Sequence, residues 1–155
     1  MDVRFSDAEI AQMLAEHKPL PGDYQARLQL RPRSGHKRAE LEIRTTSGNR
    51  FRIMLRQNML NALDFSAIVA CAPPKSNLFF RLRRYNGKSH EHTNRLEGMS
   101  FYDFHIHTAT ERYQALGAKE EAFAEPSDRF ADLRGAIAWS TAAFDDPMTL
   151  SSPFL

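Results

Sequence analysis

Cysteine is nearly absent from this sequence, and long apolar runs are missing altogether. The single cysteine, Cys71, excludes a disulfide within the chain, and its place in the apolar run 67–72 predicts a small buried side chain. No stretch is long and apolar enough to cross a bilayer as a helix, and residues 1–7 lack the basic and apolar regions of a signal peptide. We therefore expect a cytoplasmic protein that does not bind membranes.

Internal repeats and low-complexity segments are also missing, which argues against fibrous and disordered chains. A length of 155 residues fits one domain of ordinary size, and eleven Phe, four Tyr and one Trp supply volume for a core. We expect residues 1–155 to form a single globular domain.

Charge is low in total but unevenly distributed. The formal net charge is +2, yet residues 25–96 hold fifteen Arg and Lys against four Asp and Glu, whereas residues 97–155 hold four against ten. A basic surface of this kind attracts nucleic acid or another polyanion, while the alternative is a set of solvated strand faces. The residues expected to contact nucleic acid or an acidic protein are Arg27, Arg31, Arg50, Arg52, Arg56, Arg84 and Lys88.

Hydrophobic periodicity predicts an α+β fold. Ser6 and Glu9 form a capping box before an apolar pattern of helical spacing, which predicts an N-terminal helix over residues 6–17. Apolar and polar residues then alternate with the period of half-buried strands. The expected strands cover 26–31, 40–44, 50–56, 64–72, 78–83 and 101–108.

These strands predict an antiparallel sheet of about six strands within residues 25–108, because turn residues connect them at short intervals. Residues 109–143 are expected to form helices packed on one face of the sheet, including a helix capped by Ser127. Residues 145–155 have no periodicity and are expected to be a loose tail.

Histidine is the residue type whose placement points to chemistry. Four of the six histidines fall in two His-x-His pairs, His90 with His92 and His105 with His107. On a strand, each pair places both rings on one face about 7 Å apart. If the two strands pair with each other, all four rings come within reach of one small ligand.

Three interpretations follow from such a cluster. Imidazoles could act as general acid and base on a phosphodiester without a metal, with Arg81 and Arg83 stabilising the charge at phosphorus. Alternatively, His90, His92, His105 and His107 could bind zinc or another transition metal, since neutral imidazole is a good ligand. The third interpretation is ordinary polar packing. The first is preferred, because no cysteine accompanies the histidines and the nearby carboxylates are not spaced as ligands.

A longer pattern runs through the same part of the chain. It consists of Phe80-Arg81-Leu82, Asn86-Gly87, His92-Thr93-Asn94, Gly98 and His105-Ile106-His107. In order and spacing this resembles a family of small uncharacterised proteins from bacteria and their mobile elements, a domain of unknown function. The resemblance implies no established activity. In style it is also similar to small RNA-cutting toxins that carry Arg and His on the strands of the active face.

These observations leave two main functional hypotheses. The leading one is a nucleic-acid- or nucleotide-acting protein, a metal-independent ribonuclease-like toxin of a toxin–antitoxin pair, with His92, His105, His107, Arg81 and Arg83 as catalytic residues. The other is a non-enzymatic phage or mobile-element protein that inhibits a nuclease defence system through a basic sheet face. A metal-binding domain is the third. The sequence does not decide whether the chain is an enzyme, or whether it is a monomer or a homodimer.

Overall fold

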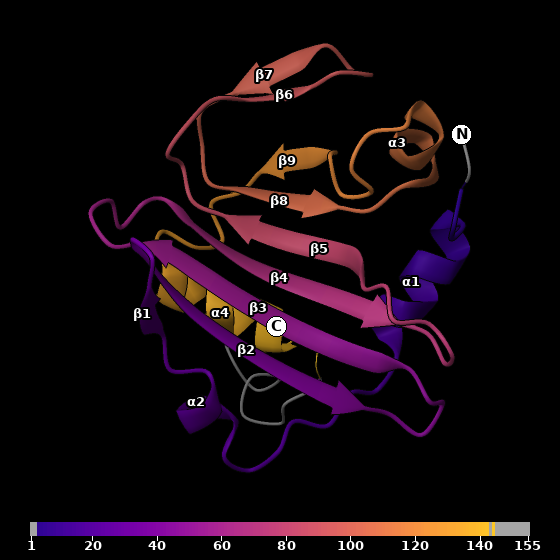
Figure 1. The fold of residues 1–155 in the computed structure, drawn as a ribbon. Helices are drawn as coiled ribbons and strands as arrows, with labels where there is room; N and C mark the ends of the chain where they lie inside the picture. The colour runs from indigo at the N-terminus through magenta and orange to yellow at the C-terminus, as the bar shows by residue number, and fades with distance from the viewer. Residues whose placement is uncertain (1–2, 143, 145–155) are drawn as a thin grey trace.

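An antiparallel sheet of seven strands forms the centre of the molecule, in the order β1-β2-β3-β4-β5-β8-β9 (Figure 1). The computed structural model describes residues 3–142 and 144. The strands of the sheet are β1 Arg31–Arg33, β2 His36–Arg44, β3 Arg50–Asn58, β4 Phe65–Ala72, β5 Phe80–Asn86, β8 His105–Thr108 and β9 Ala124–Pro126. The remaining two strands, β6 His92–Asn94 and β7 Met99–Phe101, form a separate hairpin.

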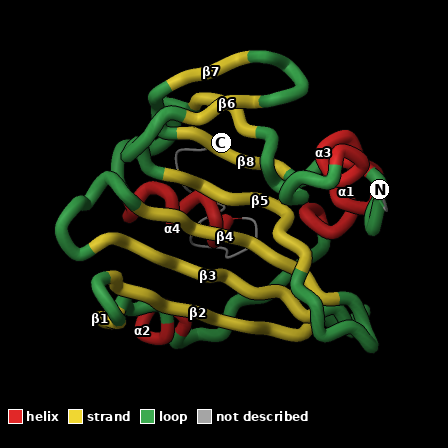
Figure 2. The backbone as a smooth tube through the Cα atoms, turned by 45° about the horizontal axis from the view of Figure 1, so that its top comes forward, coloured by secondary structure: helices red, strands yellow, loops and turns green. Residues whose placement is uncertain are grey.

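Four helices accompany the strands among the described residues: α1 Asp7–Ala15, α2 Tyr24–Arg27, α3 Glu111–Leu116 and α4 Leu133–Ala142. The predicted capping box is present at α1, because Ser6 Oγ accepts from the amide of Glu9 and Glu9 Oε1 accepts from the amide of Ser6. In Figures 1 and 2, α4 lies behind the central strands, on one face of the sheet only. The α+β class is therefore confirmed, with a larger sheet than expected. No helix in the described part of the chain is long and apolar enough to span a membrane.

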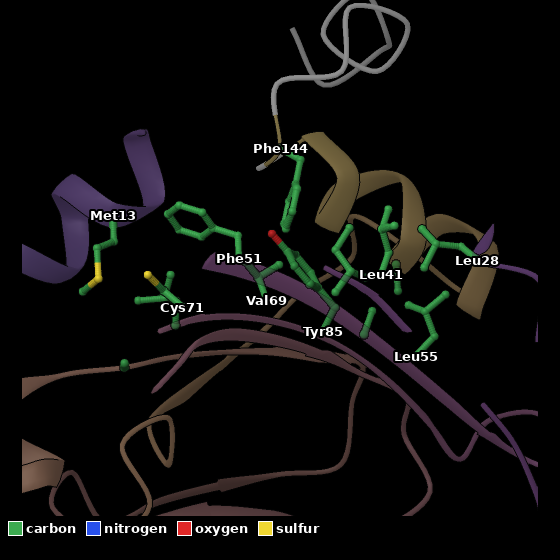
Figure 3. Close-up of a cluster of buried hydrophobic side chains, with 14 of the residues drawn as sticks. Met13, Leu28, Leu41, Phe51, Leu55, Val69, Cys71, Tyr85 and Phe144 are labelled. Carbon is green, nitrogen blue, oxygen red and sulfur yellow. The ribbon is translucent and has the colours of Figure 1, made fainter. Parts of the chain in front are cut away.

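The inner face of the sheet, which α4 covers, carries the hydrophobic core. Alternate residues of β2, β3 and β4 point into it, and Met13 of α1 and Phe144 close it from the other side (Figure 3). The buried side chains on this face include Leu41, Phe51, Ile53, Leu55, Val69, Cys71 and Tyr85. Cys71 is fully buried, as expected, and burial raises the pKa of its thiol to about 12.

The opposite, outer face of the sheet is polar. Residues directly across from each other on antiparallel strands point to the same side, so the register identifies this face. His107 lies opposite Arg84, Arg84 opposite Ile68, and Ile68 opposite Met54. The two histidines of β8 thus share the outer face with the arginines of β3 and β5. No described helix covers the β2–β4 part of it.

Several predicted elements are wrong. Residues 26–31 do not form a strand: α2 ends at Arg27, and Leu28 anchors the segment in the core, so tertiary burial outweighs the alternating pattern. The single strand expected over 101–108 is two strands, β7 and β8, in different sheets. Within the predicted helical segment 109–143, residues 124–126 form the edge strand β9. The last helix starts at Leu133 and not after Ser127, with Asp132 Oδ1 accepting from the amide of Gly135. The predicted tail, 145–155, lies outside the described residues.

A bulge in β5 places two of the predicted catalytic residues on different sides of the sheet. Arg81 and Arg83 are two residues apart and were expected on the same face. The pairing shifts between Val69 and Ala70 of β4, so that these two residues lie opposite Arg83 and Arg81 and Leu82 is the extra residue. As a result Arg83 lines a hollow beside Tyr85 on the inner side, whereas Arg81 stays on the outer side, where Arg84 joins it.

Candidate functional site

Three imidazoles converge at the β8 end of the outer face. His105 and His107 come from β8 and His92 comes from β6, and we refer to these three residues as the histidine cluster. The ring centroids of His92 lie 5.3 Å from those of His105 and 4.8 Å from those of His107, and the two β8 rings are 4.8 Å apart. One nitrogen of each ring lies within 4.8 Å of the others. The second His-x-His pair thus shares a face, as the alternation predicts.

Main-chain carbonyls fix the orientation of the two β8 rings. Nδ1 of His105 is 2.8 Å from the carbonyl oxygen of Asp103, and Nδ1 of His107 is 2.7 Å from that of Glu121. A carbonyl oxygen only accepts, so in both rings Nδ1 carries the proton and donates. The lone pair of each neutral ring is therefore on Nε2. Those atoms face the donors Asn86 Nδ2 and Arg84 Nη2, each at 3.4 Å.

Burial keeps these two rings neutral. His105 and His107 are 1% and 2% exposed. Loss of water around the charged form is the main cause that lowers the pKa of His105 to about 4 and that of His107 to about 2. For His107, the positive charge of Arg84 acts in the same direction. At neutral pH both imidazoles therefore hold one proton, on Nδ1.

Asn94 ties the β6–β7 hairpin, and with it His92, to the edge of the main sheet. Its Nδ2 donates to the carbonyl oxygen of Ala124 on β9 at 2.7 Å, and its Oδ1 accepts from the amide of the same residue at 2.9 Å. The Asn94 side chain thus pairs with β9 as a strand would. Its Oδ1 also accepts from Nε2 of His92 at 2.8 Å, and Asn94 is fully buried.

A buried carboxylate lies behind the cluster. Glu121 is 0% exposed, and its Oε2 lies 3.4 Å from Nε of Arg81 and 3.8 Å from Nε of Arg84. Neither of its carboxylate oxygens has a hydrogen-bond partner among the described residues. Burial lowers the pKa of Arg84, and the charge of Glu121 opposes that effect. Glu121 therefore makes two kinds of contact: its main-chain carbonyl accepts a hydrogen bond from His107, and its carboxylate faces Arg81 and Arg84.

A cavity of about 340 Å³ opens onto the cluster through His92 and His107. Its lining is rich in positive charge and in hydrogen-bond donors, and contains one carboxylate, Asp64, which pairs with Arg56. The polar lining residues are Arg56, Ser66, Arg84, Asn86, Ser89, His90, Thr93, Arg95 and Lys119. Such a cavity suits an anionic ligand better than a neutral or cationic one.

The structure separates the predicted catalytic residues. The two His-x-His strands do not pair, since β6 pairs with β7 and β8 with β5 and β9. His90 is exposed and lies outside the cluster, although it lines the cavity. Arg83 is on the other side of the sheet, and its place on the outer face is taken by Arg84. Arg81 contacts Glu120 and Glu121.

The residues predicted to bind nucleic acid are also divided. Arg31, Arg50, Arg52 and Arg56 share the outer face with the cluster, because the register places them across from outer-face residues. Arg27 belongs to α2 and lies off this face. Arg50 and Arg52 form ion pairs with the carboxylates of β2, and Nζ of Lys88 lies over the ring of Phe104 at 5.3 Å.

Three residues of the site received no functional role from the sequence: Glu121, Asn86 and Asn94. Glu121 lies in a segment with no strand periodicity. Asn86 and Asn94 belong to the pattern that resembles a family of small proteins, and that pattern is the signal that could have drawn attention to them. Their roles depend on contacts with residues 14 to 37 positions away.

We expect Asn94→Ala to release the hairpin and with it His92. The change removes two hydrogen bonds to Ala124 and leaves its buried amide and carbonyl unpaired, at a cost of about 1–3 kcal/mol per group. Chemical denaturation would measure the fall in the free energy of unfolding, and amide hydrogen exchange would report faster opening of residues 92–101. Thr93→Ala, which loses one exposed bond to Ser100, is the matched control. Equal stability of the two variants would contradict the anchoring role.

We expect the metal-free protein to lose stability as the pH falls below about 6.5. Folding lowers the pKa of His105 to about 4 and of His107 to about 2, so the unfolded chain binds more protons below its own pKa of about 6.5. Each ring then removes about 1.4 kcal/mol per pH unit from the free energy of unfolding. Urea denaturation at pH values from 7 to 5 measures how the free energy of unfolding depends on pH. His107→Gln should reduce this dependence by the contribution of one proton, about 1.4 kcal/mol per pH unit. A ring of His107 that protonates near pH 6.5 in the folded protein, followed by NMR, would refute the expectation.

Comparisons of the chain with protein-family models, with curated proteins and with solved structures find no match. The resemblance to the family of small bacterial and mobile-element proteins therefore stays a prediction. What the chain does has to be argued from the geometry of the histidine cluster and its cavity.

Proposed function

We propose that the protein is a metal-dependent phosphoesterase whose histidine cluster binds Zn²⁺ or a related divalent metal ion. One observation carries this proposal: three imidazoles from two separate strands converge beside a cation-lined cavity, with two of them held by main-chain carbonyls. Three protein ligands with a fourth position left for water or substrate are the usual arrangement of a catalytic zinc site.

The donor set fits such a metal ion. Hydrogen bonding of Nδ1 to a carbonyl fixes the tautomer and leaves the lone pair of His105 and His107 on Nε2, which is the outer-shell arrangement typical of metal-ligating histidines. A tetrahedral site with Zn–N bonds of about 2.1 Å places its nitrogens about 3.4 Å apart. The present separation, up to 4.8 Å, requires a closure of about 1.4 Å.

Positive charge selects the substrate class. Arg84 lies nearest the cluster, with Nη2 3.4 Å from Nε2 of His107, and is close enough to reach an oxygen of an anion bound there. Arg56, Arg95 and Lys119 line the same cavity. Guanidinium groups form paired hydrogen bonds to phosphate and stabilise the charge that develops on phosphorus during transfer.

The roles of the chain's own residues follow. His92, His105 and His107 would hold the metal ion, which when bound would lower the pKa of its water to about 7 and polarise a phosphoryl oxygen. Arg84 orients the phosphate, and Glu121 keeps Arg84 and His107 in place from behind. Burial of the cluster excludes bulk water from its inner side.

A metal-independent phosphodiesterase receives less support from the same geometry. Such a mechanism needs one protonated imidazole as general acid at neutral pH. Burial lowers the pKa values of His105 and His107 to about 4 and about 2, so both rings are neutral at that pH. Neutral imidazole, in contrast, is the form that binds a metal ion.

We expect the untagged protein to bind one equivalent of Zn²⁺ or Co²⁺, measured by elemental analysis and by titration calorimetry. His105→Ala and His107→Ala should each lower the affinity at least 10-fold, since each removes a ligand. His90→Ala is the matched control, because His90 is an exposed histidine of the same loop outside the cluster, and should leave the affinity unchanged. Wild-type protein without stoichiometric metal, or equal effects of all three variants, would refute the metal site.

We expect slow, metal-dependent hydrolysis of bis(p-nitrophenyl) phosphate, abolished by a chelator and restored by added metal. Arg84→Gln should lower kcat/KM by about 10²-fold, the effect of removing one donor that stabilises developing charge, while metal binding persists. Arg83→Gln, the neighbouring arginine on the inner side of the sheet, should have kcat/KM within 2-fold of wild type. Hydrolysis that survives metal removal, or equal losses in both variants, would contradict the proposed mechanism.

A further inference from the structure

A continuous row of polar side chains crosses the outer face from one edge of the sheet to the histidine cluster. The register places Arg31 of β1 opposite Arg38 of β2, and Arg38 opposite Arg56 of β3. The row continues through Ser66 of β4 and Asn86 of β5 to His105 of β8. We call Arg31, Arg38, Arg56, Ser66 and Asn86 the cationic row.

The row runs across the strands, so its length follows from the strand spacing. Neighbouring strands lie about 4.8 Å apart, and five such steps separate β1 from β8, which makes the row about 24 Å long. That length fits a short single-stranded segment, comparable with the roughly 4 nucleotides at the lower limit of known single-strand sites.

The charge of the row is available at its outer end. Arg31 and Arg38 are exposed, and neither forms an ion pair with any carboxylate of the described residues. Elsewhere on the same face, four residues before Arg56 on β3, Arg52 is neutralised by Glu40 and Glu42 at 3.4 and 2.8 Å. A hollow of about 720 Å³ at the β1 end is lined by Arg31 and Arg38 together with Arg33.

The inner end of the row enters the cavity at the cluster. Arg56, Ser66 and Asn86 line that cavity together with Arg84 and His107. Donors therefore follow one another without a break from the sheet edge to the imidazoles, and the described part of the chain leaves this face of β2–β4 uncovered by any helix. A duplex, as a rigid rod about 20 Å wide, cannot bring a phosphate to rings as buried as those of His105 and His107.

We propose that a single-stranded nucleic acid lies along the cationic row. Its backbone phosphates contact Arg31, Arg38 and Arg56, and one phosphodiester enters the cavity at the histidine cluster. The inference deepens the proposed function, on which it rests only for the chemistry at the cavity end. It adds Arg38 to the arginines indicated by the sequence and makes a polynucleotide, not a mononucleotide, the substrate.

Binding is tested with metal-free protein in the presence of a chelator, so that the result does not depend on catalysis. Fluorescence anisotropy follows labelled octamers of U and of dT over a range of salt concentrations. The logarithm of the association constant should fall linearly with the logarithm of the salt concentration. The expected slope is about −0.7 per phosphate contact, which makes about −2 for three contacts. An RNA octamer that binds more tightly than DNA identifies RNA as the substrate, and the reverse identifies DNA.

Charge reversal locates the surface. Arg31→Glu with Arg38→Glu should weaken octamer binding at least 10-fold and flatten the salt dependence. Arg134→Glu is the matched control, because Arg134 is an exposed arginine of α4 on the opposite side of the sheet. An affinity that falls equally in this control, a salt-independent affinity, or equally tight binding of a polyglutamate of the same length would overturn the cationic row.

Turnover separates this inference from the proposed function. The variant with Arg31→Glu and Arg38→Glu should hydrolyse bis(p-nitrophenyl) phosphate and bind metal as the wild type does, and should lose only the cleavage of oligonucleotides. Octamer binding through the row by a protein that neither binds metal nor cleaves the small diester would refute the phosphoesterase and leave the row standing. Metal-dependent diester cleavage without octamer binding would refute the row alone.

Discussion

The buried charge cluster of Glu121, Arg81 and Arg84 is the constraint on which the site depends. The carboxylate of Glu121 has no exposure and faces two guanidinium groups, and removing one partner from a buried ion pair costs about 3–5 kcal/mol. The cluster joins β5 to the segment between α3 and β9. The carbonyl of the same Glu121 also orients the ring of His107. Glu121 thereby couples the strand that carries Arg84 to the strand that carries His107.

In the histidine cluster, hydrogen bonds fix the orientation of two rings, and burial makes protonation of the same rings unfavourable. Two rings are buried beside Arg84, and this environment opposes protonation, so that the lone pair on Nε2 is kept and faces the side chains of Arg84 and Asn86. A site of this kind is unsuited to donating protons and suited to binding a metal ion and, next to it, an anion. His92 differs from the other two, because it is half-buried and comes from a hairpin held by the Asn94 side chain. Two of the three imidazoles thus come from β8 of the main sheet, and the third comes from β6, in the hairpin that Asn94 holds.

On the outer face of the sheet, polar residues extend from the histidine cluster beyond the cavity. Antiparallel pairing aligns residues that are far apart in the sequence into rows, and one row of cations and neutral donors ends at His105. Neighbouring arginines on the same face are neutralised by carboxylates of β2. Within the row Arg56 pairs with Asp64, so the row arginines that lack a carboxylate partner among the described residues are Arg31 and Arg38 at its outer end.

Local signals in the sequence determined much of the fold. The capping box at Ser6 and the alternation at Phe51, Ile53 and Leu55 predicted α1 and β3, because hydrogen bonding at a helix start and burial of one strand face are decided within a few residues. The same alternation placed His105 and His107 on one face. It misled at residues 26–31, where anchoring of Leu28 in the core favoured a helical turn.

Only the tertiary structure decided which histidines meet and which arginine joins them. The bulge at Leu82 moves Arg83 to the inner side and leaves Arg84 beside His107, and a single-residue shift of this kind has no signature in an alternating pattern. The meeting of His92 with β8 depends on the pairing of Asn94 with Ala124, thirty positions away. The sequence by itself determined the start of α1 and the core-facing residues of β3, since those follow from hydrogen bonding and periodicity over a few residues. Register, bulges and the packing of the hairpin depend on long-range contacts, and these determined the site.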